Sequence, residues 1–262
     1  MSVITLDGEI IHYEVLGRGK PLIFLHGWVG SWRYWVPTMQ AASISYRAYA
    51  IDLWGFGDTA KKAEMYTLSE QANLLNSFLE ALGITKVALI GHGLGAIVAM
   101  NFADRWPQSV DRIMVTTFPL RGSAINSRLR TLPVNELAEW LLGKLPATEA
   151  ARNEAIKTDS QAILTSLDDL VNMNLMEMPV TMMTPCLFVH GQNDLVVEVP
   201  PQVILDGLPE HAHYIIFDQS GHFPMLDEAS KFNRLLFDFL SLGSGESPRQ
   251  LQLKEEWKRR IR

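Results

Sequence analysis

Residues 86–106 constrain the fold more than any other stretch of the chain. Residues 87–90 form an apolar run of the kind that becomes a buried strand. Glycines follow at positions 91, 93 and 95, and apolar residues then continue at helical spacing as far as Trp106. A strand, a tight glycine turn and a helix in this order leave backbone N–H groups pointing out of the helix N-terminus. This stretch therefore indicates an α/β protein with a candidate site at the turn.

Strand and helix signals alternate along most of the chain. The segment after Thr67 begins with Thr-Leu-Ser-Glu, a capping box, and its helical spacing ends at Gly83. Strands that alternate with helices predict a mostly parallel central sheet covered by helices on both faces. We expect strands at 3–6, 10–15, 21–25, 49–53, 87–90, 110–116, 186–190 and 213–217, and further helices at 32–42, 199–205 and 227–239.

The strand signal disappears between residue 118 and about residue 184. Helical patterns replace it at 132–145, 148–157 and 160–173. We therefore expect a core formed by 1–118 and 185–242, with a helical lid, 119–184, inserted into it. Residues 243–262 are predicted to be a linker and a charged tail, in which Leu253, Trp257 and Ile261 share one helical face.

Composition excludes several classes of function. The formal net charge is −6, so we expect no nucleic-acid partner. Cys186 is the single cysteine, which excludes an internal disulfide and a cysteine-based zinc site. The chain shows neither a basic leader nor an apolar run of about 20 residues. We expect a cytoplasmic protein with a small-molecule substrate or ligand and no membrane span, and we leave a homodimer open.

The glycine turn satisfies one pattern that the rest of the chain does not support. Gly91, Gly93 and Ala96 match the dinucleotide-binding fingerprint G-x-G-x-x-G/A. That fingerprint predicts an acidic residue about 20 positions later, at the end of the next strand. The next predicted strand ends in Thr-Thr-Phe-Pro, and Asp111 lies at its start. We therefore do not favour a dinucleotide site.

Residues 91–95 also occupy the positions of a strand–turn–helix pattern G-x-S-x-G, the nucleophile elbow. Four further motifs lie at the ends of predicted strands: His26-Gly27-Trp28, Asp52-x-x-Gly55-x-Gly57-x-Thr59, Gly191-Gln-Asn-Asp194 and Ser220-Gly-His222-Phe-Pro224. In this order they resemble the oxyanion loop, the D-x-x-G-x-G-x-S turn, the acid turn and the histidine loop of the α/β-hydrolases of the lid-bearing esterase, lipase and C–C hydrolase type. The resemblance covers about residues 9–242 and implies an α/β-hydrolase fold.

The resemblance also implies a set of site residues. Gly93 stands at the nucleophile position, Asp194 is the acid and His222 the base, in the family's chain order. The N–H groups of Trp28 and Leu94 would form the oxyanion hole. We expect the substrate pocket to include His26, Phe118, Trp140 and Leu141.

Glycine at position 93 makes the chemistry unusual, because it has no side chain with which to form an acyl-enzyme. No other side chain is a good candidate for the missing nucleophile, since none combines elbow geometry with a position facing the site. The candidates considered are His92, Cys186, Thr116 and Thr117. Glycine does suit the strained backbone of an elbow, so a serine lost naturally or replaced by engineering would leave a stable turn.

Three functions stay open at this point. The first is a cofactor-free and metal-free hydrolase, with weak or altered activity on a small, largely apolar ester, amide or carbonyl compound, in which His222 and Asp194 activate water. The second is a non-catalytic ligand-binding protein that keeps the hydrolase pocket. The third is a cofactor-free dioxygenase that uses the His–Asp pair as a base toward its substrate.

Overall fold

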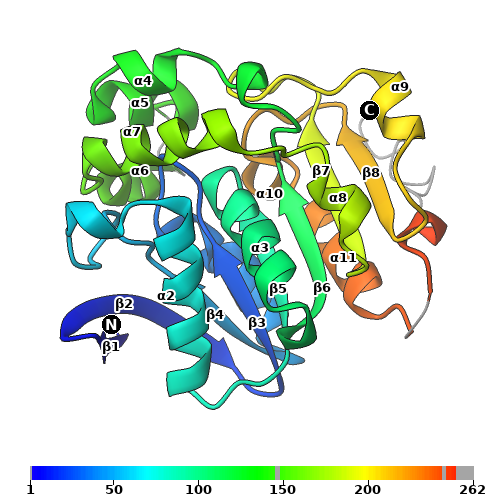
Figure 1. Ribbon diagram of the computed structural model, residues 1–262, viewed down its shortest axis with the longest axis horizontal. Helices are drawn as coiled ribbons and strands as arrows, with labels where there is room; N and C mark the ends of the chain where they lie inside the picture. The colour runs from blue at the N-terminus through cyan, green and yellow to red at the C-terminus, as the bar shows by residue number, and fades with distance from the viewer. Residues whose placement is uncertain (1, 145–147, 244–245, 252–262) are drawn as a thin grey trace.

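The computed structural model describes residues 2–144, 148–243 and 246–251. Eight strands form one sheet in the order β1-β2-β4-β3-β5-β6-β7-β8 (Figure 1). β2 is antiparallel to both β1 and β4, and every other neighbouring pair is parallel. The predicted mostly parallel sheet is therefore confirmed. The strands are β1 Ser2–Leu6, β2 Glu9–Gly17, β3 Lys20–Leu25, β4 Tyr46–Ile51, β5 Val87–His92, β6 Val110–Thr116, β7 Cys186–Gly191 and β8 Ala212–Phe217.

Helices cover both faces of this sheet. α2, α3 and α8 lie on the face toward the viewer in Figure 1, and α1 packs against α11 on the other face. β5 lies between the two layers and every one of its residues is buried, as expected for a central parallel strand. The core helices are α1 Val36–Ala42, α2 Leu68–Ala81, α3 Leu94–Arg105, α8 Met178–Thr181, α9 Gln202–Asp206, α10 Pro224–Asp227 and α11 Ala229–Leu240.

Local sequence signals explain where several helices begin and end. The Thr67 side chain accepts the Glu70 N–H at 3.2 Å, so the predicted cap of α2 is present. The predicted helix over 32–42 begins instead as a 3-10 turn, Trp32–Trp35, before α1. The predicted helix over 227–239 begins two residues later, as α11, because the backbone of Glu228 has φ −127° and ψ 52°, is not helical, and separates α11 from the short α10.

A helical insertion follows β6 and returns to the sheet at β7. Its helices α4–α7 lie over the end of the sheet to which the arrows of β6 and β8 point (Figure 1). Asp159 is the N-cap of α7, and its side chain accepts a hydrogen bond from the Gln161 N–H at 2.9 Å. The three predicted helices are present but shorter than expected, as α5 Val134–Leu142, α6 Glu149–Ala155 and α7 Ser160–Asp169, which is followed by the 3-10 turn Leu170–Asn172. The short helix α4 Arg128–Thr131 was not predicted.

Part of the predicted linker packs on the sheet edge. The 3-10 turn Pro248–Gln250 lies beside β8, where the Arg249 guanidinium donates to the carbonyl of Leu208. His213 also contacts the Leu251 carbonyl at 3.1 Å. The tail helix predicted from residue 253 onward lies outside the described residues. Within the described ranges, no helix combines the length and the hydropathy needed to cross a bilayer.

Candidate active site

The site is built around the turn that joins β5 to α3. Gly93 occupies this turn with φ 51° and ψ −111°, and its N–H donates to the Thr116 carbonyl at 3.0 Å. A Cβ placed on Gly93 would lie 3.3 Å from the Trp28 indole and 3.5 Å from the Gly27 Cα. The oxyanion-loop candidate therefore stands directly beside position 93. A positive φ is costly for any residue except glycine, and this turn requires it.

Asp194 and His222 meet at the same edge of the sheet. The Nδ1 of His222 lies 3.0 Å from each carboxylate oxygen of Asp194. A carboxylate only accepts hydrogen bonds, so Nδ1 carries the proton and Nε2 has a free lone pair. His222 is only 7% exposed, and its Nε2 has no partner among the described residues. This is the orientation that a general base requires.

The acid turn holds Asp194 in its charged form. Its Oδ1 also accepts hydrogen bonds from the N–H groups of Val196 at 2.7 Å and of Val197 at 3.2 Å. Burial raises the pKa of this carboxyl, but the charge and hydrogen bond of His222, with help from His190 and the Val196 N–H, outweigh burial and lower the pKa. Asp194 thus both caps its own turn and orients the His222 ring.

Two backbone N–H groups near position 93 remain available. Leu94 is the first residue of α3, where an amide has no acceptor inside the helix. Neither the Leu94 nor the Trp28 N–H has a partner among the hydrogen bonds of the described residues. Free amides at a helix N-terminus favour an anion, such as the oxyanion of a reacting carbonyl group.

A hydrogen-bonded bridge links the oxyanion loop to the histidine loop. The Gly27 N–H donates to the Tyr34 hydroxyl at 2.6 Å, and this hydroxyl lies 2.8 Å from Nδ1 of His92. Nε2 of His92 lies 2.8 Å from the His222 carbonyl, so Nε2 is protonated and Nδ1 accepts from Tyr34. Burial, followed by the nearby His222, lowers the pKa of His92 well below its ordinary value. His92 is therefore a neutral residue that bridges the two loops. No motif or spacing in the sequence indicated that Tyr34 takes part in this bridge.

Comparison with known proteins decides the family. A family model described as the alpha/beta hydrolase family matches residues 22–235. The chain belongs to the alpha/beta hydrolase family.

Several similar proteins carry the names of hydrolases. The putative carbamate hydrolase RutD of Yersinia enterocolitica is 24% identical over 94% of this chain and 97% of its own length. The 2-hydroxy-6-oxo-6-phenylhexa-2,4-dienoate hydrolase of Comamonas testosteroni is 25% identical over 92% of this chain and 94% of its own. Among solved structures, a serine-to-glycine mutant of the N-acyl homoserine lactonase AidH, complexed with N-hexanoyl homoserine lactone, has a TM-score of 0.80 at 19% identity, covering 91% of this chain and 96% of that one.

The four residues predicted to line a pocket lie in different surroundings. Both ring nitrogens of His26 bind backbone, Nδ1 to the Gly27 carbonyl at 2.9 Å and Nε2 to the Leu53 N–H at 3.0 Å, so the ring supports the oxyanion loop. Phe118 is buried against Phe188. The Arg128 guanidinium covers the Trp140 ring at 5.2 Å, and Leu141 is half-buried against the core.

The Trp28 side chain connects the core to the helical insertion. Its indole is 1% exposed and packs over Gly93. Its Nε1 donates to the Ser166 hydroxyl on α7 at 3.0 Å, and that hydroxyl donates to the Ile163 carbonyl at 2.8 Å. Trp28 therefore ties α7 to the turn at position 93, a contact that the sequence did not predict.

The side chains considered as substitute nucleophiles have no base beside them. Cys186 is buried next to Met100, and burial raises the pKa of its thiol. The Thr116 and Thr117 hydroxyls are buried without a hydrogen-bond partner among the described residues. Thr117 also has φ 53°, an outlier for a β-branched residue. An unactivated hydroxyl or thiol is a weak nucleophile, so none of the three replaces a serine.

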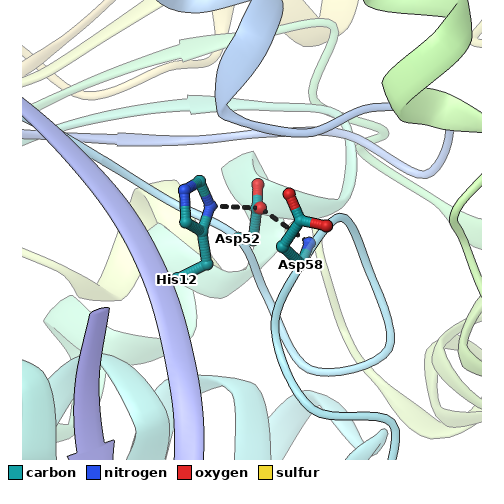
Figure 2. Close-up of side chains that lie close together, drawn as sticks. All are labelled: His12, Asp52 and Asp58. Carbon is teal, nitrogen blue, oxygen red and sulfur yellow. Dashed lines mark hydrogen bonds and ion pairs between the residues drawn. The ribbon is translucent and has the colours of Figure 1, made fainter. Parts of the chain in front are cut away.

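A second cluster of titratable groups lies at the 52–59 turn (Figure 2). His12, Asp52 and Asp58 bring ligand-type atoms within 4.8 Å of one another. The Asp52 carboxylate already accepts from His12 Nδ1 at 2.7 Å and from the N–H groups of Trp32 at 2.8 Å and Asp58 at 3.1 Å. The Asp58 carboxylate pairs with the Lys157 ammonium at 3.0 Å. These groups are committed to holding the turn, so the cluster fits a structural role better than a metal site.

Proposed function

We propose that this protein is a cofactor-free hydrolase that acts on a small, largely apolar ester, amide or related carbonyl compound through directly activated water. The observation that carries this proposal is the geometry of His222, whose Nδ1 donates to Asp194 while Nε2 stays free. Gly93 offers no side chain for a covalent intermediate, so water is the nucleophile left to the pair. The hydrolase names of RutD and of the Comamonas enzyme support the reaction class.

The proposed reaction proceeds in two steps. Water attacks the carbonyl carbon while its proton passes to Nε2 of His222, and Asp194 stabilises the resulting imidazolium. The negative oxygen accepts hydrogen bonds from the N–H groups of Trp28 and Leu94. In comparable sites each such donor stabilises the transition state by about 2.7–4 kcal/mol. The tetrahedral intermediate then collapses, and the leaving group takes the proton from His222. The products are the acid and the protonated leaving group.

Initial rates on p-nitrophenyl acetate and butyrate test this proposal. We expect His222→Ala and Asp194→Asn to lower kcat/KM, the histidine variant by at least about 100-fold, the low end for a general base. His211→Ala is the matched control, since His211 binds the Pro179 carbonyl away from the site and its loss should leave the rate unchanged.

A ligand-binding protein without catalysis is the second candidate. It is favoured by the Trp28 indole, which covers position 93 closely enough to hinder a substrate there. Rates that are equal in the unmodified protein and in His222→Ala, together with measurable binding of the same ester, would reject hydrolysis in favour of this candidate. Oxygen consumption with a bound substrate would instead indicate the dioxygenase alternative.

A further inference from the structure

A cavity of about 480 Å³ lies inside the helical insertion, outside the residues already assigned to the reaction. Its volume falls within the range of about 300–1,000 Å³ that is usual for small-molecule sites. Segment 120–127, which follows β6, forms one wall, and the end of α7 with residues 170–176 forms the other. The wall formed by α7 and residues 170–176 is mainly apolar, with Leu167, Leu170, Met173 and Leu175, whereas segment 120–127 contributes Leu120 and Ile125 among polar residues.

Both charged residues that line this cavity are positively charged. Its lining includes Arg121 and Arg130 and no carboxylate, although the whole chain carries a net charge of −6. Arg130 pairs with Asp168 at 2.6 Å. The Arg121 guanidinium has no hydrogen-bond or ion-pair partner among the described residues, and only its backbone carbonyl is bonded, to the Ala124 N–H at 3.1 Å. A guanidinium beside an apolar wall is suited to a ligand with an apolar body and an anionic end.

Both walls of the cavity belong to segments that also contact residues near the candidate active site. Segment 120–127 is fastened to the acid turn, because the Asn126 N–H donates to the Val196 carbonyl at 2.7 Å and the Glu198 N–H to the Ala124 carbonyl at 3.0 Å. On the other wall, α7 directs Leu167 to the cavity and the neighbouring Ser166 to the Trp28 indole. The cavity and the candidate active site are therefore connected through α7 and through the residues that follow Asp194.

We propose that this cavity binds the non-reacting part of the substrate, and that this part is an apolar chain ending in one negative charge held by Arg121. The assignment as a substrate site rests on the proposed hydrolase function. The substrate class is then an ester or amide of an acyl compound that carries a carboxylate, or a similar anionic group, distant from the reacting carbonyl.

Titration calorimetry with octanoate and with the uncharged octanamide tests the binding site without any turnover. We expect octanoate to bind the unmodified protein about tenfold more tightly, as one charge-assisted hydrogen bond would provide. Arg121→Gln should remove this preference and Arg121→Lys should keep part of it. Arg128→Gln is the matched control, because Arg128 covers the Trp140 ring and does not line the cavity. No preference for octanoate, or equal losses in the Arg121→Gln and Arg128→Gln variants, would overturn the proposal.

Hydrolysis then separates failure of the cavity from failure of the reaction. We expect mono-p-nitrophenyl suberate to have a higher kcat/KM than p-nitrophenyl octanoate, with the advantage lost in Arg121→Gln. Equal kcat/KM values in an active enzyme would overturn the substrate assignment and leave the hydrolase function standing. Octanoate binding that depends on Arg121, in a protein without esterase activity, would support the anion site and reject the hydrolase function.

Discussion

Replacing Gly93 by serine should restore a nucleophile at a cost in stability that the turn geometry sets. Position 93 has φ 51° and ψ −111°, a conformation that costs a residue with a Cβ about 1–3 kcal/mol. The reduced freedom of serine in the unfolded chain offsets about 0.4–1 kcal/mol of this. The new Cβ would also lie 3.3 Å from the Trp28 indole, which must yield slightly. We expect Gly93→Ser to lower the free energy of unfolding by about 1–2 kcal/mol, or the Tm by about 2–8 °C.

The assay pairs thermal unfolding with esterase rates on p-nitrophenyl acetate. Gly93→Ala is the matched control, because it adds the same Cβ without a hydroxyl. Both variants should lose similar stability. Only Gly93→Ser should gain activity, by at least about 10³-fold, which corresponds to about 4 kcal/mol of barrier. Adding His222→Ala to Gly93→Ser should abolish the gain.

Two outcomes would contradict this reasoning. A folded Gly93→Ser variant without added activity would mean that Nε2 of His222 does not face the serine hydroxyl. The site would then be unsuited to acyl transfer. An increase in stability for both variants would mean that the positive φ at position 93 carries no strain for larger residues.

Two further predictions concern stability. Burial lowers the pKa of His26, His92 and His190 below the ordinary 6.5, so below about pH 6.5 the unfolded chain binds more protons than the native one. Urea unfolding should therefore show lower stability at pH 5.5 than at pH 7.5, and the opposite trend would refute this assignment. Ser166→Ala leaves the Trp28 Nε1 without its acceptor and should cost about 1–3 kcal/mol. Thr165→Ala on the same helix should change stability by no more than about 0.5 kcal/mol, and equal losses would reject the Trp28 contact as the cause.

The core of the fold and the His–Asp pair were predictable because their signals are local. β5 is an apolar run that ends in glycines, and the capping box before α2 is four consecutive residues. The alpha/beta hydrolase family was likewise recognisable from short motifs at strand ends. Glu228 shows the limit of such patterns, because the apolar spacing of residues 227–239 does not reveal the non-helical backbone at Glu228, after which the helix begins.

Contacts between distant parts of the chain were not predictable. Tyr34 and His92 are 58 positions apart, and Trp28 and Ser166 are 138 apart. Neither pair belongs to a motif, and a tyrosine or serine in such a position has no periodicity that distinguishes it. The same holds for Arg121, whose place beside a cavity depends on how segment 120–127 folds against the acid turn.

The bridge from Gly27 through Tyr34 and His92 to the His222 carbonyl passes behind the elbow without using a side chain at position 93. The hydrogen bonds that join the oxyanion loop to the histidine loop therefore do not depend on a side chain at position 93. Position 93 can thus change its side chain without loss of a hydrogen bond in this bridge. We therefore expect a substitution at position 93 to change the groups that line the turn while this bridge stays in place.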